Sequence, residues 1–242
     1  MRLLLPLLLA GSPAFAGDPD ELAHLGDPVR IQSVLAADPA AATRRDAEGR
    51  TALHHAAEGD LAAVEALVEG GADIDARTKA GATPLYLAVR ANRYEIARYL
   101  LDRGADPDAA GTAGPPLAEA VAQGTPEMVR LLVQRGANPR VTDKTGATPL
   151  HAAVATGRIE LVRALLDGGA PANATDHAGN TPLHVLAAKS GRAGGLEIAR
   201  LLVERGARPN ARDNEGRTPL GLADTRGARE VAEVLRARGG VE

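Results

Sequence analysis

The stretch GATPLHAAVATGRIELVRALLDGGAP, residues 146–171, decides the fold because similar sequences recur several times along the chain. GATPLYLAVRANRYEIARYLLDRGAD begins at Gly81, and GNTPLHVLAAKS begins at Gly179. The leucine of this motif recurs every 32 to 37 residues, at Leu53, Leu85, Leu117, Leu150, Leu183 and Leu220. Self-similarity at such a period predicts an array of stacked units.

The residues of one unit explain its local structure. Thr148 can accept a hydrogen bond from a free N–H of the first helical turn, and Pro149 fits the first position of a helix. Gly157 ends that helix. A second helix follows with apolar residues at helical spacing, namely Ile159, Val162, Leu165 and Leu166. Neither helix can bury its apolar stripe alone, so the units must stack.

The period near 33 residues, with TPL and a closing Gly-Ala pair in most units, resembles the ankyrin repeat. The resemblance covers residues 47–242 and extends in weaker form to about residue 21. It implies an all-α solenoid of helix-turn-helix units joined by hairpin loops. The expected divisions are a degenerate N-terminal capping repeat at 17–46, repeats at 47–79, 80–112, 113–144, 145–177 and 178–214, and a C-terminal capping repeat at 215–242.

Three units depart from the pattern, and the first of them, 47–79, is one residue short between its helices, at EGD. The 113–144 unit has Pro115 in place of the motif threonine and Ala118 in place of the motif histidine. The 178–214 unit has about four extra residues near AAKSGRAGG, residues 187–195. Insertions usually fall in loops, so we expect a longer turn between the two helices of that unit.

The first residues, MRLLLPLLLAGSPAFAG, read as a secretory signal peptide. Arg2 gives the positive start, the apolar run is too short to span a bilayer, and small residues at 14 and 16 suit a signal peptidase. We therefore expect residues 1–16 to be removed after Ala16 and the mature protein to be periplasmic or secreted.

Composition restricts the chemistry. The chain has no Cys, which excludes disulfides and thiol nucleophiles, and its net charge of −3 gives no argument for nucleic acid. No later segment is long and apolar enough to predict membrane insertion. No catalytic, metal or cofactor motif stands out, so we expect no enzyme, no metal and no cofactor. Paired acids such as Asp73 and Asp75 are interpreted as solvated turn residues.

The histidines at first suggest a catalytic or metal site. His54, His151 and His184 each follow the motif leucine, and the resemblance implies that each joins the motif threonine and the neighbouring backbone in a structural hydrogen-bond network. The pair at 54 and 55 is a weak metal candidate because neighbours on a helix point in different directions. His24 and His177 are interpreted as isolated.

The resemblance also implies a protein partner bound by the hairpin tips, the concave face and the exposed ends of the first helices. Tyr86 stands where the motif has histidine, and is either an anchor for that partner or packed within its own repeat. The candidate partner-binding residues are Arg50, Lys79, Tyr86, Arg90, Gln123, Lys144, Thr156, His177, Asn180, Lys189, Arg217 and Arg226. We expect a monomeric, non-catalytic protein-interaction scaffold. The alternative is an inhibitor, immunity or accessory protein that protects or occludes a secreted enzyme or toxin.

Overall fold

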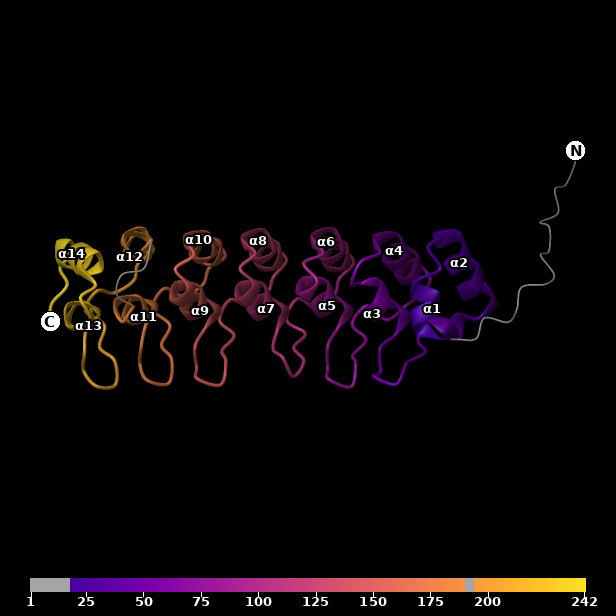
Figure 1. The fold of residues 1–242 in the computed structure, drawn as a ribbon, viewed down its shortest axis with the longest axis horizontal. Coiled ribbons are helices and arrows are strands. Elements are labelled where there is room, and N and C mark those ends of the chain that lie inside the picture. The colour runs from indigo at the N-terminus through magenta and orange to yellow at the C-terminus, as the bar shows by residue number, and fades with distance from the viewer. Residues whose placement is uncertain (1–17, 190–193) are drawn as a thin grey trace, which may run out of the picture.

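The computed structural model describes residues 18–189 and 194–242. These residues form an all-helical array, a long row of helix pairs, as the sequence predicts (Figure 1). The signal peptide expected at 1–16 lies outside the described residues. So do residues 190–193 of the insertion expected near 187–195.

The helices form two parallel layers along the row (Figure 1). The first helices of the pairs are α1 (Pro19–Ala23), α3 (Ala52–Ala56), α5 (Pro84–Arg90), α7 (Pro116–Gln123), α9 (Pro149–Thr156), α11 (Pro182–Ala187) and α13 (Pro219–Arg226). The second helices are α2 (Pro28–Ala37), α4 (Leu61–Glu69), α6 (Tyr94–Asp102), α8 (Pro126–Gln134), α10 (Ile159–Asp167), α12 (Gly195–Glu204) and α14 (Arg229–Ala237). A short 3-10 helix, Pro39–Ala42, follows α2.

The first helices begin where the threonine–proline motif predicts. The side chain of Thr83 accepts a hydrogen bond from the backbone N–H of Tyr86 at 3.2 Å, and Pro84 opens the helix. Thr148 and Pro149 begin α9 in the same way, and that helix ends at Gly157 with a positive φ of 73°. Helix α7 begins after Pro115, which provides no side-chain cap.

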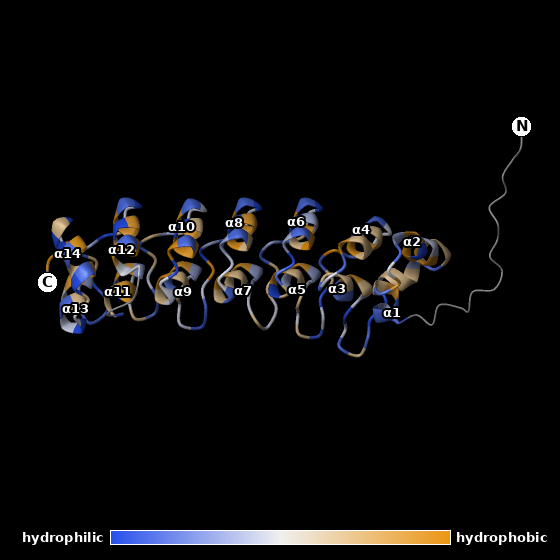
Figure 2. Ribbon diagram, turned by 45° about the horizontal axis from the view of Figure 1, so that its top comes forward, coloured by the Kyte–Doolittle hydropathy of each residue, from blue (hydrophilic) through white to orange (hydrophobic). Residues whose placement is uncertain are grey.

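The core lies between the two layers and runs the length of the row. The motif leucines of the first helices are buried, as are leucines on the facing side of the second helices, for example Leu67, Leu132 and Leu202. Figure 2 shows hydrophilic residues along the outer surface of α6, α8, α10 and α12 and hydrophobic ones toward the first helices. Each unit therefore buries its apolar stripes against the next unit.

The hairpin loops project from the first-helix layer, away from the second helices (Figure 1). Most neighbouring loops are joined by single backbone hydrogen bonds near their tips, such as Lys79 N–H to Glu48 C=O at 3.0 Å and His177 N–H to Thr145 C=O at 2.9 Å. We use the term hairpin face for the surface formed by these loops, residues 46–50, 78–82, 111–114, 143–147, 176–180 and 213–217, together with the C-terminal ends of the first helices.

Candidate functional site

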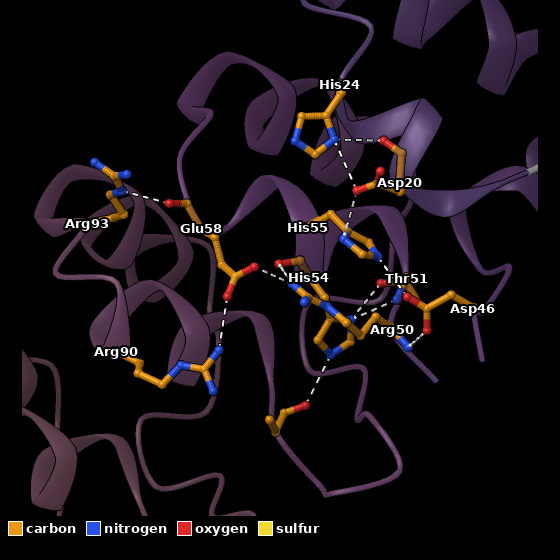
Figure 3. Close-up of polar contacts among 11 residues, drawn as sticks. Asp20, His24, Asp46, Arg50, Thr51, His54, His55, Glu58, Arg90 and Arg93 are labelled. Carbon is orange, nitrogen blue, oxygen red and sulfur yellow. Dashed lines mark hydrogen bonds and ion pairs between the residues drawn. The ribbon is translucent and has the colours of Figure 1, made fainter. Parts of the chain in front are cut away.

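The motif histidines are structural, as predicted. The backbone N–H of Thr51 donates to His54 Nδ1 at 3.0 Å, and the Thr51 hydroxyl lies 2.9 Å from the same nitrogen. Because Nδ1 accepts, the ring proton sits on Nε2, which donates to the carbonyl of Ala82 in the next unit at 3.1 Å (Figure 3). His54 thus fixes the start of its own helix and joins two units.

The same arrangement recurs along the row. His151 lies 2.9 Å from the hydroxyl of Thr148, and its Nε2 lies 2.9 Å from the carbonyl of Asn180. His184 repeats this geometry with Thr181 and with the carbonyl of Arg217, at 3.0 Å. Burial lowers the pKa of His54 from 6.5 to about 4 and also lowers the pKa of His151. Both rings are therefore neutral at physiological pH.

Aspartates shape the hairpin loops, a role that the sequence analysis missed. Asp143 Oδ1 accepts from the backbone N–H groups of Thr145 at 2.8 Å and Ala147 at 3.0 Å. The Thr145 hydroxyl and these N–H groups lower the pKa of Asp143. Asp46, Asp176 and Asp213 each accept two backbone N–H groups in the equivalent place.

The acids interpreted as solvated turn residues have a further role. Asp73 does accept from the N–H two residues ahead, at 3.1 Å, which is the local bond expected of a turn residue. Asp75, however, accepts from the N–H of Asp106 in the next unit at 3.0 Å, and Asp108 accepts from Asn138 at 2.8 Å. These carboxylates therefore tie one unit to the next.

Two of the candidate partner-binding residues are held in a network around Glu58 (Figure 3). The Glu58 carboxylate pairs with Arg50 of its own unit and, at 3.0 Å, with Arg90 of the next. The side chain of Arg93 donates to the Glu58 carbonyl at 2.7 Å. Burial raises the pKa of Glu58, but the two arginines outweigh it, and the net pKa is lowered. The carboxylate thus stays charged between its two partners.

Tyr86 is packed within the array and is not an exposed anchor. Only 5% of it is exposed, and its hydroxyl donates to Glu119 Oε2 at 3.1 Å. Burial and the Glu119 carboxylate raise the pKa of Tyr86. Gln123 donates to Glu119 Oε1 and to the carbonyl of Arg90, both at 2.8 Å. Tyr86 and Gln123 thus join the 80–112 and 113–144 units.

The other candidates are spread along the hairpin face. Four are exposed cations that form no ion pair within the described residues, namely Lys79, Lys144, Lys189 and Arg226. Arg217 is paired with Asp213 at 2.8 Å, and Asn180 donates to Asp176 at 3.0 Å. His177 and Thr156 are exposed, and the Thr156 hydroxyl donates to its own helix, at the carbonyl of Ala153.

His24 is not isolated, contrary to the sequence analysis. Its Nδ1 lies 2.9 Å from the carbonyl of Asp20 and 3.2 Å from the Asp20 carboxylate. That carboxylate also lies 3.1 Å from His55, whose other ring nitrogen is 2.9 Å from Asp46 (Figure 3). His55 thereby connects the N-terminal cap to the first hairpin. Among residues 18–189 and 194–242, no group of three or more His, Cys, Asp or Glu is arranged to hold a metal.

The comparisons with known proteins agree with this architecture. A family model described as ankyrin repeats, in 3 copies, matches residues 23–110, 117–213 and 168–242. The chain belongs to the ankyrin-repeat family. Ankyrin repeats are protein–protein interaction modules, so the hairpin face is a candidate surface for a protein partner. None of the described helices has the length and apolar character needed to cross a membrane.

Solved ankyrin structures match the fold closely. An ankyrin repeat domain from Acinetobacter baumannii AYE is 34% identical, with a TM-score of 0.74, over 78% of this chain and 98% of that one. The ankyrin repeat domain of Bcl-3, a member of the IkappaB protein family, is 29% identical, with a TM-score of 0.79, over 90% of this chain and 98% of that one.

The curated relatives match over shorter segments. Protein phosphatase 1 regulatory subunit 27 of Homo sapiens is 50% identical over 62 residues, which are 25% of this chain and 40% of that protein. B-cell lymphoma 3 protein of Homo sapiens is 38% identical over 101 residues, which are 38% of this chain and 22% of that protein. The chain therefore spans less than half the length of these relatives.

Proposed function

We propose that this ankyrin-repeat protein is a non-catalytic, monomeric scaffold of the periplasm that binds a protein partner through its hairpin face. The observation that carries the proposal is a row of exposed cations on this face that form no ion pair with residues 18–189 or 194–242, namely Lys79, Lys144, Lys189 and Arg226. The motif histidines, by contrast, are buried in structural bonds. A surface with uncommitted charges attracts and orients a partner of complementary charge.

The periplasmic location rests on the N-terminal sequence alone. Residues 1–16 combine a positive start, an apolar run and a small-residue cleavage site. Mass spectrometry of the protein purified from its native host should find Gly17 at the N-terminus. A full-length product in the cytoplasm would contradict export.

Site-specific photo-crosslinking tests the binding surface. A photoreactive phenylalanine analogue replaces Ala80 or Ala178, exposed residues of the hairpin loops, so that the cations stay in place. In a control variant it replaces Arg163, an exposed residue on the outer side of α10. We expect one discrete crosslinked partner from the two hairpin positions and none from position 163. Crosslinks at position 163 alone would place the partner on the second helices and refute the proposal.

An inhibitor, immunity or accessory role is a second candidate. It is supported by the 62-residue match to a protein named as a regulatory subunit of a phosphatase. The partner found by crosslinking decides between the two roles. If that partner is an enzyme or toxin whose activity falls when the purified chain is added, the second role holds. If the partner's activity is unchanged at a saturating concentration of the purified chain, the scaffold role is favoured.

A further inference from the structure

The row of hairpins is interrupted at one place. Tip-to-tip backbone bonds join Lys79 to Glu48, Thr112 to Ala80, His177 to Thr145, and Asn214 to Ala178. In the described part of the chain, no such bond joins loop 111–114 to loop 143–147. Loop 111–114 instead closes on itself through a bridge between Gly111 and Gly114. The junction between the 113–144 and 145–177 units is therefore open at the hairpin face.

The histidine that joins units elsewhere is also missing at this junction. In three other units the motif histidine is buried and lies against the carbonyl of the residue before the next motif threonine. Here the equivalent residue is Ala118, which is only half-buried, and the equivalent carbonyl belongs to Ala147. That carbonyl accepts from the N–H of Asp143 at 3.0 Å. A carbonyl oxygen has two lone pairs, so a second donor has room to bind.

A hollow of about 680 Å³ lies at this junction. Small and apolar residues line much of it, among them Gly111, Pro115, Ala118, Val121 and Ala147. The volume falls within the range of about 300–1,000 Å³ that is usual for ligand sites. The chain itself shows what fits beside the carbonyl, because an imidazole ring fills the equivalent place in the other three units.

Two charged residues line the hollow, the cation Lys144 and the carboxylate Asp143. Lys144 lines the hollow, is exposed, and forms no ion pair within the described residues. The neighbouring Asp143 carboxylate is already committed to the N–H groups of Thr145 and Ala147. A partner group that approaches Lys144 is therefore favoured when it carries a carboxylate.

We propose that the hollow beside Ala118 binds a tyrosine side chain of a partner protein, followed in that partner by an acidic residue. The ring fills the hollow and packs against its apolar lining. The hydroxyl at its tip donates to the Ala147 carbonyl, as the imidazole donates to the equivalent carbonyl in the other units. The acidic side chain pairs with Lys144. The inference rests on the proposed function, because it names the partner group that the hairpin face receives.

Tyrosine suits the site better than the other rings. Its donor lies at the far end of the ring, so the hydroxyl can reach the Ala147 carbonyl while the ring lies against the apolar lining. Tyrosine also buries a large area for few rotatable bonds, which makes it frequent at the centre of interfaces. A phenylalanine would leave the Ala147 carbonyl without its second donor.

Short peptides test the site on the purified protein without any cellular partner. The probes are N-acetyl-Tyr-Glu-amide, its Phe-Glu analogue without the hydroxyl, and its Tyr-Gln analogue without the charge. Binding is followed by the amide NMR shifts of the isotope-labelled chain. We expect Tyr-Glu to shift Gly111, Gly114, Lys144 and Ala147, and each analogue to bind about fivefold more weakly, as the loss of one hydrogen bond or ion pair implies.

Matched variants locate the effect. Ala118→His fills the hollow and should abolish peptide binding, whereas Ala122→His, at an exposed position on α7 outside the hollow, should leave it unchanged. Ala118→Leu is a second blocking variant if the histidine variant fails to fold. Lys144→Ala should weaken Tyr-Glu and leave Tyr-Gln unchanged. Lys79→Ala, at the equivalent place on a closed junction, should affect neither.

The outcomes separate this inference from the proposed function. Shifts that persist in both blocking variants, equal binding of Phe-Glu and Tyr-Glu, or no shifts around the hollow at all would each overturn the tyrosine site. If the peptides bind but crosslinking finds no partner, the proposed function fails and the site stands. If a partner crosslinks at the hairpin positions but the peptides do not bind, the proposed function stands and the site fails.

Discussion

Acid should weaken the array through buried His54. Its ring is fully buried, and its Nδ1 accepts from the N–H of Thr51. A proton on Nδ1 would turn that acceptor into a donor facing a donor. Burial lowers the pKa of the folded chain's His54 from 6.5 to about 4. At a pH between these two pKa values, His54 takes up a proton in the unfolded chain but not in the folded chain.

The sign and size follow from this difference. Because the folded pKa is depressed, the contribution of neutral His54 is fully present above about pH 6.5 and is lost as the pH falls toward 4. Each pH unit in that window removes about 1.4 kcal/mol. The loss relative to pH 7.5 is therefore about 2 kcal/mol at pH 5 and about 3 kcal/mol near pH 4. The lowered pKa of His151 adds to it.

The variant His54→Gln tests this account. The Gln amide can accept and donate but cannot titrate, so part of the structure is kept and the pH dependence is removed. Urea unfolding measures how much the free energy of unfolding falls from pH 7.5 to pH 5. In His54→Gln this fall should be about 2 kcal/mol smaller than in the wild type. His177→Gln, at an exposed residue, is the control and should keep the wild-type loss.

A direct titration would expose an error in the reasoning. The ring protons of His54, followed by NMR, should stay in the neutral form down to pH 5. A midpoint near 6.5 for this ring, or a loss of stability in His54→Gln equal to that of the wild type, would refute the argument from burial.

Two further predictions concern the hairpin loops. A methyl group added at Gly111 would lie 2.8–3.0 Å from backbone atoms of residues 80–82 in the neighbouring loop, so Gly111→Ala should lower the melting temperature followed by circular dichroism, while Ala113→Ser in the same loop should not. Asp213 accepts from two backbone N–H groups and from the side chain of Arg217, which outweigh burial and lower its pKa. Asp213→Ala should cost about 1–3 kcal/mol in the free energy of urea unfolding at pH 7. The unfolded chain protonates Asp213 near pH 3.8 and the folded chain only at lower pH, so the cost should shrink as the pH falls below 3.8. An equal cost at pH 7 and at low pH would contradict this role.

The fold was predictable because its determinants are local and repeated. The threonine–proline pairs at 83–84 and 148–149 begin helices through contacts within four residues. The leucine period then requires stacking, because no unit can bury its stripe alone. The histidine bonds follow from the resemblance, since each histidine occupies the same place in its unit.

The candidate surface was less predictable because its contacts join residues about one period apart. The sequence left Tyr86 as either an anchor or a residue packed within its own repeat, and the structure shows its hydroxyl bound to Glu119, 33 residues ahead. Arg50 and Arg90 share Glu58 across two units. His24 meets Asp20 within the cap, and its neighbour in space, His55, lies 31 residues away in sequence. No local motif encodes these pairs.

The acceptor in the histidine bond is a backbone carbonyl, and this has a consequence for how the protein can change over time. The carbonyl belongs to Ala82 in one unit, Asn180 in another and Arg217 in a third. Every amino acid supplies the same oxygen, so these positions can be substituted without losing the bond between units. The same positions lie beside the hairpin tips, where a partner would meet the side chain. Substitution there can diversify recognition while the scaffold beneath it is conserved.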